Sequence, residues 1–135
     1  IGSPTGVLSL EDRVEGILHP LGPVEGQFLV LLDFAHATDG GRNVPVRKFG
    51  SFHNAVGEEL SLQMEGTYDA TTAIAIYELQ VVSGTGRFAG ATASGSWRVP
   101  APDEIDAGGA GSGAEELDGV LRLAPRRRIA RIAVR

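Results

Sequence analysis

Alternating apolar and polar residues dominate the chain and predict an all-β protein. The clearest run covers residues 59–69. Polar side chains hold one parity of this run, and the other parity is apolar, with Leu60, Leu62, Met64 and Tyr68. Because successive side chains of a strand point to opposite faces, this pattern predicts a half-buried strand with one wet face.

Comparable patterns predict further strands over residues 13–19, 27–38, 46–53, 72–83, 91–99 and 117–123. The run 72–83 is apolar on both parities, so we expect both of its faces to be covered. Residues 129–134 are ambiguous between strand and helix, and no run predicts a helix of about ten residues. Several strands at this spacing favour a closed barrel or a sandwich.

The length of 135 residues fits one domain. We assign residues 1–125 to a single barrel domain and interpret residues 126–135 as an Arg-rich C-terminal segment, strand or tail. Residues 100–116 are rich in Pro, Gly and Ala, which predicts a flexible loop within the domain and a candidate lid. No apolar run is long enough to span a membrane. We expect a soluble protein. The start of the chain is not informative about the compartment, which stays open between cytoplasmic and secreted.

Charge and composition exclude several classes of function. The net charge is −5, and five of the 12 basic residues lie within 126–135, so residues 1–125 carry 7 basic against 17 acidic residues. Such an acidic body disfavours nucleic acid as a partner. The absence of cysteine excludes disulfides, thiolate metal sites and cysteine nucleophiles.

The most distinctive segment is residues 81–95, VVSGTGRFAGATASG. A buried strand runs into Gly84 and Gly86, which permit positive φ in a sharp corner, and Phe88 can then turn inward. Gly84, Gly86 and Ala89 also match a relaxed dinucleotide-binding pattern, but that pattern requires an amphipathic helix directly afterwards. Residues 89–97 alternate instead, which argues against a dinucleotide site.

This segment resembles the strand–corner–strand signature of the allene oxide cyclase and dirigent superfamily, VVGGTGxF followed by spaced Ala and Gly. Ser83 replaces the first Gly, and the matching residues are Val81, Val82, Gly84, Thr85, Gly86, Phe88, Ala91 and Gly95. The strand before the corner, Leu60 to Tyr68, is also similar to that family's strand, so the likeness covers residues 58–99.

The resemblance implies an eight-stranded antiparallel calycin-like β-barrel with a hydrophobic lumen, assembled as a homodimer or homotrimer. Its members include plant cyclases, dirigent proteins that guide radical coupling, and bacterial spirotetronate cyclases that perform intramolecular Diels–Alder reactions. The plant cyclase's acidic residue corresponds to a position near Ala75, so that carboxylate does not carry over. The dirigent Asp and Arg residues have no assignable counterparts either.

Bulky residues on the predicted strands are candidates to line a lumen and bind a small hydrophobic molecule. They are Phe34, His36, Met64, Tyr68, Tyr77 and Trp97. The alternative interpretation is ordinary core packing. The chain has only eight aromatic residues and many Ala and Gly, which favours a cavity over a filled interior.

Two other groups of residues are candidate sites. His19, His36 and His53 could converge on a metal from adjacent strands, but they show no recognisable ligand spacing, and we predict no metal site. Glu65 and Glu78 lie mid-strand, where a buried carboxyl could act as an acid or base. Glu65 shares its parity with polar residues, which indicates a wet face.

Three functions follow as hypotheses. The first is a cyclase or isomerase without a cofactor, which folds a polyketide- or lipid-like substrate by shape while Tyr68, Tyr77 and Trp97 orient it. The second is a non-catalytic barrel that binds or carries a lipophile. The third is a structural barrel with a filled lumen. The sequence identifies no catalytic residue.

Overall fold

The computed structural model describes residues 6–19, 22–102, 104–105 and 111–124. This part of the chain consists of strands, turns and three short 3-10 helices. The strands are β1 (Val7–Leu18), β2 (Gly22–Asp33), β3 (Asn43–Asn54), β4 (Glu59–Asp69), β5 (Ile74–Glu78), β6 (Val81–Gly84), β7 (Thr92–Val99), β8 (Glu104–Ile105), β9 (Gly111–Ser112) and β10 (Glu116–Arg122). The 3-10 helices are η1 (Phe34–His36), η2 (Asp39–Gly41) and η3 (Gly86–Phe88). The prediction of an all-β protein is confirmed. Within the same described ranges, no helix is long and apolar enough to cross a membrane.

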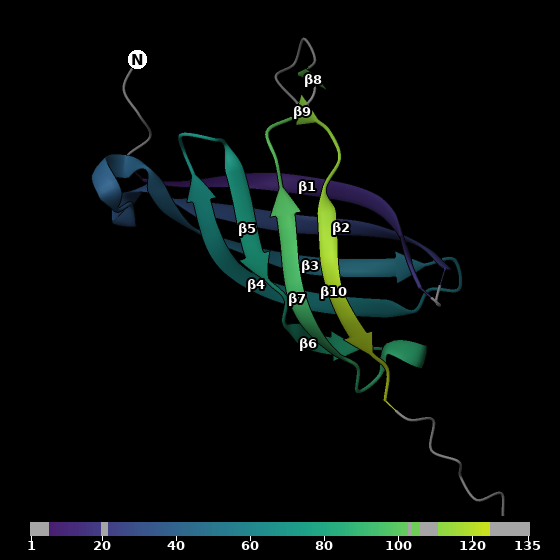
Figure 1. Cartoon of the computed structure of the whole chain (residues 1–135). Helices are drawn as coiled ribbons and strands as arrows, with labels where there is room; N and C mark the ends of the chain where they lie inside the picture. Colours follow the sequence, from purple (N-terminus) through teal and green to yellow (C-terminus); the bar gives the residue numbers. More distant parts are fainter. Residues whose placement is uncertain (1–5, 20–21, 103, 106–110, 125–135) are drawn as a thin grey trace, which may run out of the picture.

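The strands form one antiparallel sheet that curls into a half-barrel (Figure 1). Its order is β1-β2-β3-β4-β5-β7-β10, and β6 pairs with β4 beside β5. β8 and β9 form a separate small pair inside the segment predicted as a loop. β1 and β10 are the two edges and do not pair with each other over the described residues. The sheet is therefore antiparallel and barrel-like, with an open side.

Three predicted strands differ clearly from the structure. The run 13–19 is only the last part of β1, which begins at Val7. The run 27–38 ends as a strand at Asp33, because the Asp33 side chain accepts a hydrogen bond from the backbone N–H of His36 and caps η1. The run 72–83 is split into β5 and β6, which pair with different parts of β4. Its two faces are not both covered by the residues that the structure describes, since Ile76 is 49% and Val82 60% exposed. Residues 103, 106–110 and 126–135, which include the predicted Arg-rich segment, lie outside the described residues.

The concave side of the sheet carries the core. Inward side chains follow the predicted alternation, as the buried Leu60, Leu62 and Met64 of β4 show. The other buried apolar residues come from neighbouring strands and the corner: Val24, Phe28, Val30, Leu32, Val44, Val46, Phe52, Ala75, Tyr77, Phe88, Ala91 and Trp97. Removing this apolar surface from water is the main source of stability for the curled sheet.

The glycine corner between β6 and β7 forms as predicted, with Phe88 completely buried. Gly86 adopts a φ of 57°, a left-handed conformation that favours glycine. Gly84 serves a different purpose, because a side chain there would overlap the backbone carbonyl of Phe88. The corner therefore closes one end of the core by tight backbone packing.

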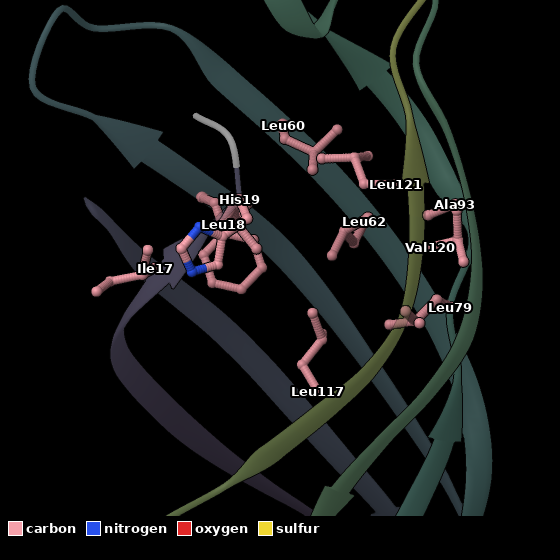
Figure 2. A pocket seen from close by; sticks show the side chains of 12 residues that line it. Ile17, Leu18, His19, Leu60, Leu62, Leu79, Ala93, Leu117, Val120 and Leu121 are labelled. Atoms are coloured by element: carbon pink, nitrogen blue, oxygen red, sulfur yellow. The ribbon is translucent and has the colours of Figure 1, made fainter. Parts of the chain in front are cut away.

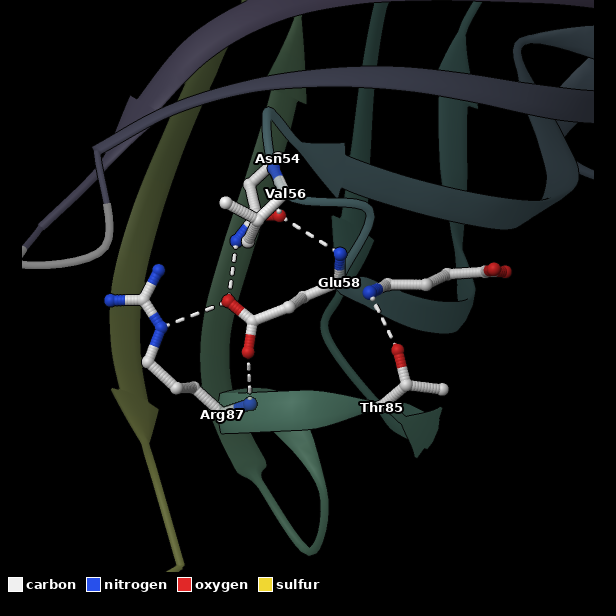
Figure 3. A network of polar contacts seen from close by, with 6 residues as sticks. Asn54, Val56, Glu58, Thr85 and Arg87 are labelled. Atoms are coloured by element: carbon white, nitrogen blue, oxygen red, sulfur yellow. Dashed lines mark hydrogen bonds and ion pairs between the residues drawn. The ribbon is translucent and has the colours of Figure 1, made fainter.

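Glu58 ties the β3–β4 turn to this corner (Figure 3). Its carboxylate accepts hydrogen bonds from the backbone N–H and the Nε of Arg87, and from the side-chain amide of Asn54. These hydrogen bonds lower the pKa of Glu58 to about 2. The bond from the Arg87 backbone N–H has the largest effect, followed by those from Asn54 and the Arg87 side chain. Thr85 adds a further link, since its hydroxyl accepts a hydrogen bond from the N–H of Glu59 at 2.9 Å.

We expect Glu58→Gln to remove part of the acid sensitivity of folding. The folded pKa lies below the ordinary value of 4.5, so the carboxylate stabilises the fold above pH 4.5, and this contribution is lost as pH falls towards 2. Urea unfolding across pH 2–5 should show a shallower pH dependence in the variant. Glu65→Gln is the matched control, because the Glu65 side chain is 76% exposed and lies 4.0 Å from Arg47. Equal pH dependence of the two variants would contradict the assignment.

Candidate functional site

A cavity of about 530 Å³ opens on the concave side of the half-barrel. Most of its wall is apolar and comes from β1, β2, β5 and the start of the segment after β7. The polar side chains on this wall are few: Glu11, Asp12, Lys48, Tyr68, Tyr77 and Glu115. A largely apolar cavity with a small number of convergent polar groups is the usual form of a small-molecule site.

Lys48 of β3 is the charged residue at the centre of this site. It occupies the inward parity of β3, between Val46 and Gly50, and its side chain is 0% exposed. Its ammonium group pairs with the carboxylate of Asp12 from β1, and with Glu115, just before β10, at 3.1 Å. A buried ammonium requires such partners, because its desolvation is otherwise very costly.

Aromatic rings complete the surroundings of the ammonium. The Nζ atom of Lys48 lies 3.6 Å from the ring centroid of Trp97, and 5.4 Å from those of both Phe28 and Tyr77. The first distance is that of a close cation–π contact. Trp97 also donates a hydrogen bond from Nε1 to Glu115, to the same Oε1 atom that Lys48 contacts, at 3.1 Å. The carboxylate is thus held by a charged and a neutral donor.

The surroundings of Glu115 raise the pKa of its carboxyl group towards neutral pH. Burial and then the neighbouring Asp12 carboxyl raise the pKa of Glu115 to about 7, against the opposing effect of the Lys48 ammonium. When Asp12 and Glu115 are both ionised, the cluster of these two carboxylates and the Lys48 ammonium has a net charge of about −1. Protonation of Glu115 makes the cluster neutral. A carboxyl group with such a pKa is suited to general acid or base catalysis.

Tyr77 supplies a free hydroxyl beside this cluster. The residue is 2% exposed and lines the cavity, and its hydroxyl makes no hydrogen bond to any residue within the described part of the chain. Burial, with the charges of Asp12 and Glu115, raises the pKa of Tyr77 above its ordinary value. The phenol therefore stays protonated and remains available as a hydrogen-bond donor.

We expect the protein to lose stability as pH rises from about 4.5 to 7. The folded pKa of Glu115 lies above its ordinary value of 4.5, so the folded state holds a proton that the unfolded chain releases. The unfolding free energy should fall over this window, by at most about 1.4 kcal/mol per pH unit for one proton, and then level off. Urea unfolding of Glu115→Gln should lack this decline.

The matched control for that prediction is the neighbouring exposed carboxylate. Glu116 is exposed on β10, so Glu116→Gln should keep the decline of the parent. If Glu115→Gln and the parent show the same pH dependence, the assigned pKa of Glu115 is wrong.

The six residues predicted to line a lumen lie on the cavity wall, in the buried core or, for His36, on the exposed surface. Phe34, Tyr68 and Tyr77 lie on the cavity wall. Trp97 and Met64 are buried in the core, Trp97 against Lys48 and Met64 beside Lys48 in the β3–β4 register. Binding of a ligand by these residues stays a prediction.

His36 lies away from the cavity wall. Its side chain is 78% exposed and its Nδ1 atom is 2.7 Å from Asp33. The cause is the end of β2 at Asp33, which places His36 on η1 and not on an inward strand position.

The other histidines and the mid-strand carboxylates do not join the site either. His53 lies 3.4 Å from Glu59. Within the described ranges, no group of three His, Asp or Glu side chains is placed to hold a metal ion. Glu65 and Glu78 oppose each other in the β4–β5 register and are exposed.

The sequence interpretation missed the three charged residues at the centre: Asp12, Lys48 and Glu115. Each side chain points to the concave face of the sheet, from a strand or from the residue just before one, and is surrounded by apolar residues. One cation and two anions at such positions are the signal that could have identified them, since buried charges must be paired.

Comparison of the chain with protein-family models, curated proteins and solved structures finds no match.

Proposed function

We propose that the half-barrel binds a small, largely apolar molecule that carries a carbonyl oxygen, with this oxygen directed at the Tyr77 hydroxyl beside Glu115. The observation that carries the proposal is the Tyr77 hydroxyl. The residue is 2% exposed and lies on the wall of a cavity of about 530 Å³, and its hydroxyl has no partner in the described part of the chain. The hydroxyl is open to the cavity, since no fully buried polar side-chain atom of the described residues lacks a partner. A donor that faces a cavity without a protein partner is available to bond an oxygen of a bound ligand. A ligand with a neutral oxygen acceptor fits this cavity better than an anionic ligand, because the carboxylates of Asp12 and Glu115 would repel an anion.

The same arrangement supports proton transfer without a cofactor, as in an isomerase or cyclase. Ionised Glu115 takes a proton from the carbon next to the carbonyl, and the Tyr77 hydroxyl and the Lys48 ammonium stabilise the enolate oxygen that develops. Glu115 then returns the proton to a different carbon of the same molecule, so no other reactant is consumed. The apolar wall holds a flexible substrate in a folded shape, which lowers the entropic part of the barrier.

The fold and the glycine corner support placing the chain near the allene oxide cyclase and dirigent superfamily. Both the antiparallel curled sheet and the buried Phe88 after Gly86 agree with that resemblance. A completed calycin-like barrel, a lipophilic substrate and a homodimer or homotrimer are parts of this proposal. The acid–base residue would differ from that of the plant cyclases, because Ala75 occupies the corresponding region and Glu115 lies on another strand extension.

A non-catalytic lipophile-binding barrel is the alternative function. One observation favours it: the Oε1 atom of Glu115 already accepts hydrogen bonds from both Lys48 and Trp97 at 3.1 Å. A carboxylate held by two donors is a less reactive base. In that case the charged cluster only recognises the oxygen of the ligand.

We expect the Tyr77 hydroxyl to discriminate a ketone from a hydrocarbon of equal length. Trp97 is the sole tryptophan, so its fluorescence reports on the site during titration with 2-undecanone or undecane. Tyr77→Phe should weaken ketone binding about fivefold to tenfold, as expected for one hydrogen bond, and leave undecane binding unchanged. Tyr68→Phe is the control, since Tyr68 is half-buried on the same wall, whereas Tyr77 is the tyrosine whose ring lies 5.4 Å from the Lys48 ammonium. Equal ketone affinity of parent and Tyr77→Phe would refute the proposed binding mode.

Hydrogen–deuterium exchange of the ligand separates the enzyme from the carrier. A β,γ-unsaturated ketone is incubated with the protein in D₂O, and deuterium at the carbon next to the carbonyl is followed by NMR. An enzyme should accelerate exchange over buffer by at least about a hundredfold, and Glu115→Gln should abolish the acceleration. Binding of the ketone without accelerated exchange would favour the carrier.

A further inference from the structure

The two edge strands of the sheet, β1 and β10, run in the same direction. Each of the six pairings along the path from β1 to β10 is antiparallel, so the first and the seventh strand of the path are parallel to each other. Neither edge has a ladder partner on its outer side within the described residues. A strand placed between them would run antiparallel to both, which is the pairing found throughout this sheet.

A slot lies between these two edges, and it is hollow along its length. One cavity of about 240 Å³ is lined by Ile17 and Leu18 of β1 on one side and by Leu117 and Leu121 of β10 on the other (Figure 2). A second cavity, of about 450 Å³, continues between residues 13–18 and residues 113–117. At the far end, Lys48 connects Asp12 of one edge to Glu115 of the other through ion pairs. The slot between β1 and β10 is therefore open only beyond the point where Lys48 links Asp12 to Glu115.

The rims of the slot are apolar and carry four acidic side chains against two basic ones, Arg13 and Arg122. Ile17 is 63% exposed and Val120 is 53% exposed, which is unusual for side chains of this size. The acidic side chains along the rims are exposed and make no ion pair with another described residue: Glu11, Glu15, Glu116 and Asp118. A strand that fits this slot carries apolar side chains on one face and basic side chains on the other.

We propose that the slot is the docking site of residues 129–135 of this same chain, added as a closing strand between β10 and β1. Their sequence has the required alternation, with Ala130, Ile132 and Val134 on one parity, and Arg131 and Arg135 on the other. The apolar parity fills the cavities, and the two arginines lie beside the acidic rims.

The direction and the length of the chain agree with this assignment. β10 ends at Arg122, at the end of the slot where Leu121 and Leu18 line the first cavity. Six residues, 123–128, are then available to reverse the chain. Residues 129–135 equal β10 in number, so an extended strand matches its length. Pairing of residue 129 with Arg122 places Ala133 opposite Asp118.

Engineered cysteine pairs test the proposal, because the full-length chain contains no cysteine. Asp118→Cys with Ala133→Cys places both thiols on the outer face, within the short Cβ–Cβ separation that a disulfide needs. Asp118→Cys with Ile132→Cys is the matched control, one residue away and on the opposite face. Arg131→Cys and Arg135→Cys, each with Asp118→Cys, cover a register shifted by two residues.

Mild oxidation at low protein concentration should yield an intrachain disulfide in one outer-face pair about tenfold more than in the control. Mass spectrometry of the monomer identifies it. Equal yields in all pairs would refute a docked strand, and disulfides mainly between chains would show instead that a second copy fills the slot.

Amide hydrogen exchange of the chain without cysteines gives an independent measurement. Ile132→Pro removes a backbone donor from the proposed strand, and should speed exchange in β1 and β10 about tenfold or more, while Arg127→Pro in the connecting segment should not. Unchanged exchange of both edges in Ile132→Pro would overturn the proposal.

Discussion

Lys48→Met should destabilise the protein by about 3–5 kcal/mol, the usual loss when one partner of a buried ion pair is removed. The variant keeps the length and apolar stem of the side chain, which is completely buried. It leaves the carboxylates of Asp12 and Glu115 close together without their shared cation. It also removes the cation–π contact with Trp97. Urea unfolding followed by circular dichroism at pH 8, where Glu115 is ionised in the parent, measures the loss.

A triple variant provides the control for that prediction. Lys48→Met with Asp12→Asn and Glu115→Gln removes all three charges together, so no unpaired charge remains, and most of the lost stability should return. Lowering the pH to 5 should also reduce the loss in Lys48→Met, because Glu115, whose pKa is raised to about 7 chiefly by burial, is then neutral. A loss below about 1 kcal/mol in the single variant would mean that the ammonium is not the paired, desolvated group described above.

Trp97→Ala should cost about 3–5 kcal/mol, as is usual for truncation of a large buried aromatic side chain. Trp97 is 2% exposed and lies at the centre of an aromatic cluster. Its ring stacks on Phe52 at 5.6 Å and meets the edge of Phe28 at 4.9 Å. Truncation therefore leaves a cavity, and also deprives Lys48 and Glu115 of a partner. Circular dichroism is the suitable measurement, because the variant has lost the sole tryptophan.

Trp97→Phe distinguishes packing from the polar contacts. It keeps an aromatic face for Lys48, but lacks the N–H group that donates to Glu115. We expect a loss of roughly half that of the alanine variant. If the two variants lose equal stability, the indole N–H contributes more than the volume of the ring. If neither loses stability, the aromatic cluster is not a core.

The strands were predictable because their pattern is local. In a half-buried strand, every second side chain is apolar and faces the core. The alternation in residues 59–69 therefore predicts both the position and the inward face of β4. The glycine corner was also predictable, since the positive φ of Gly86 and the burial of Phe88 involve neighbours in the chain. The break between β5 and β6 was not, because it depends on where β4 can pair.

The charged cluster could not be predicted from such local patterns. Asp12, Lys48 and Glu115 come from three distant parts of the chain, and only the curl of the sheet brings them together. Lys48 stands in an apolar parity, where a single charge would be very unfavourable. Its two partners become recognisable once the strands carrying them are known to be the two edges of one sheet.

Lys48 also bears on the order in which the molecule folds. It contacts side chains 36 and 67 residues away along the chain. Closing such long loops costs chain entropy, whereas the β2–β3–β4 meander needs only short reversals. We therefore expect the cluster to form after the transition state for folding, so that the ion pairs mainly slow unfolding and have little effect on the rate of refolding. The lifetime of the native half-barrel thus depends on three side chains that its earliest hairpins do not need.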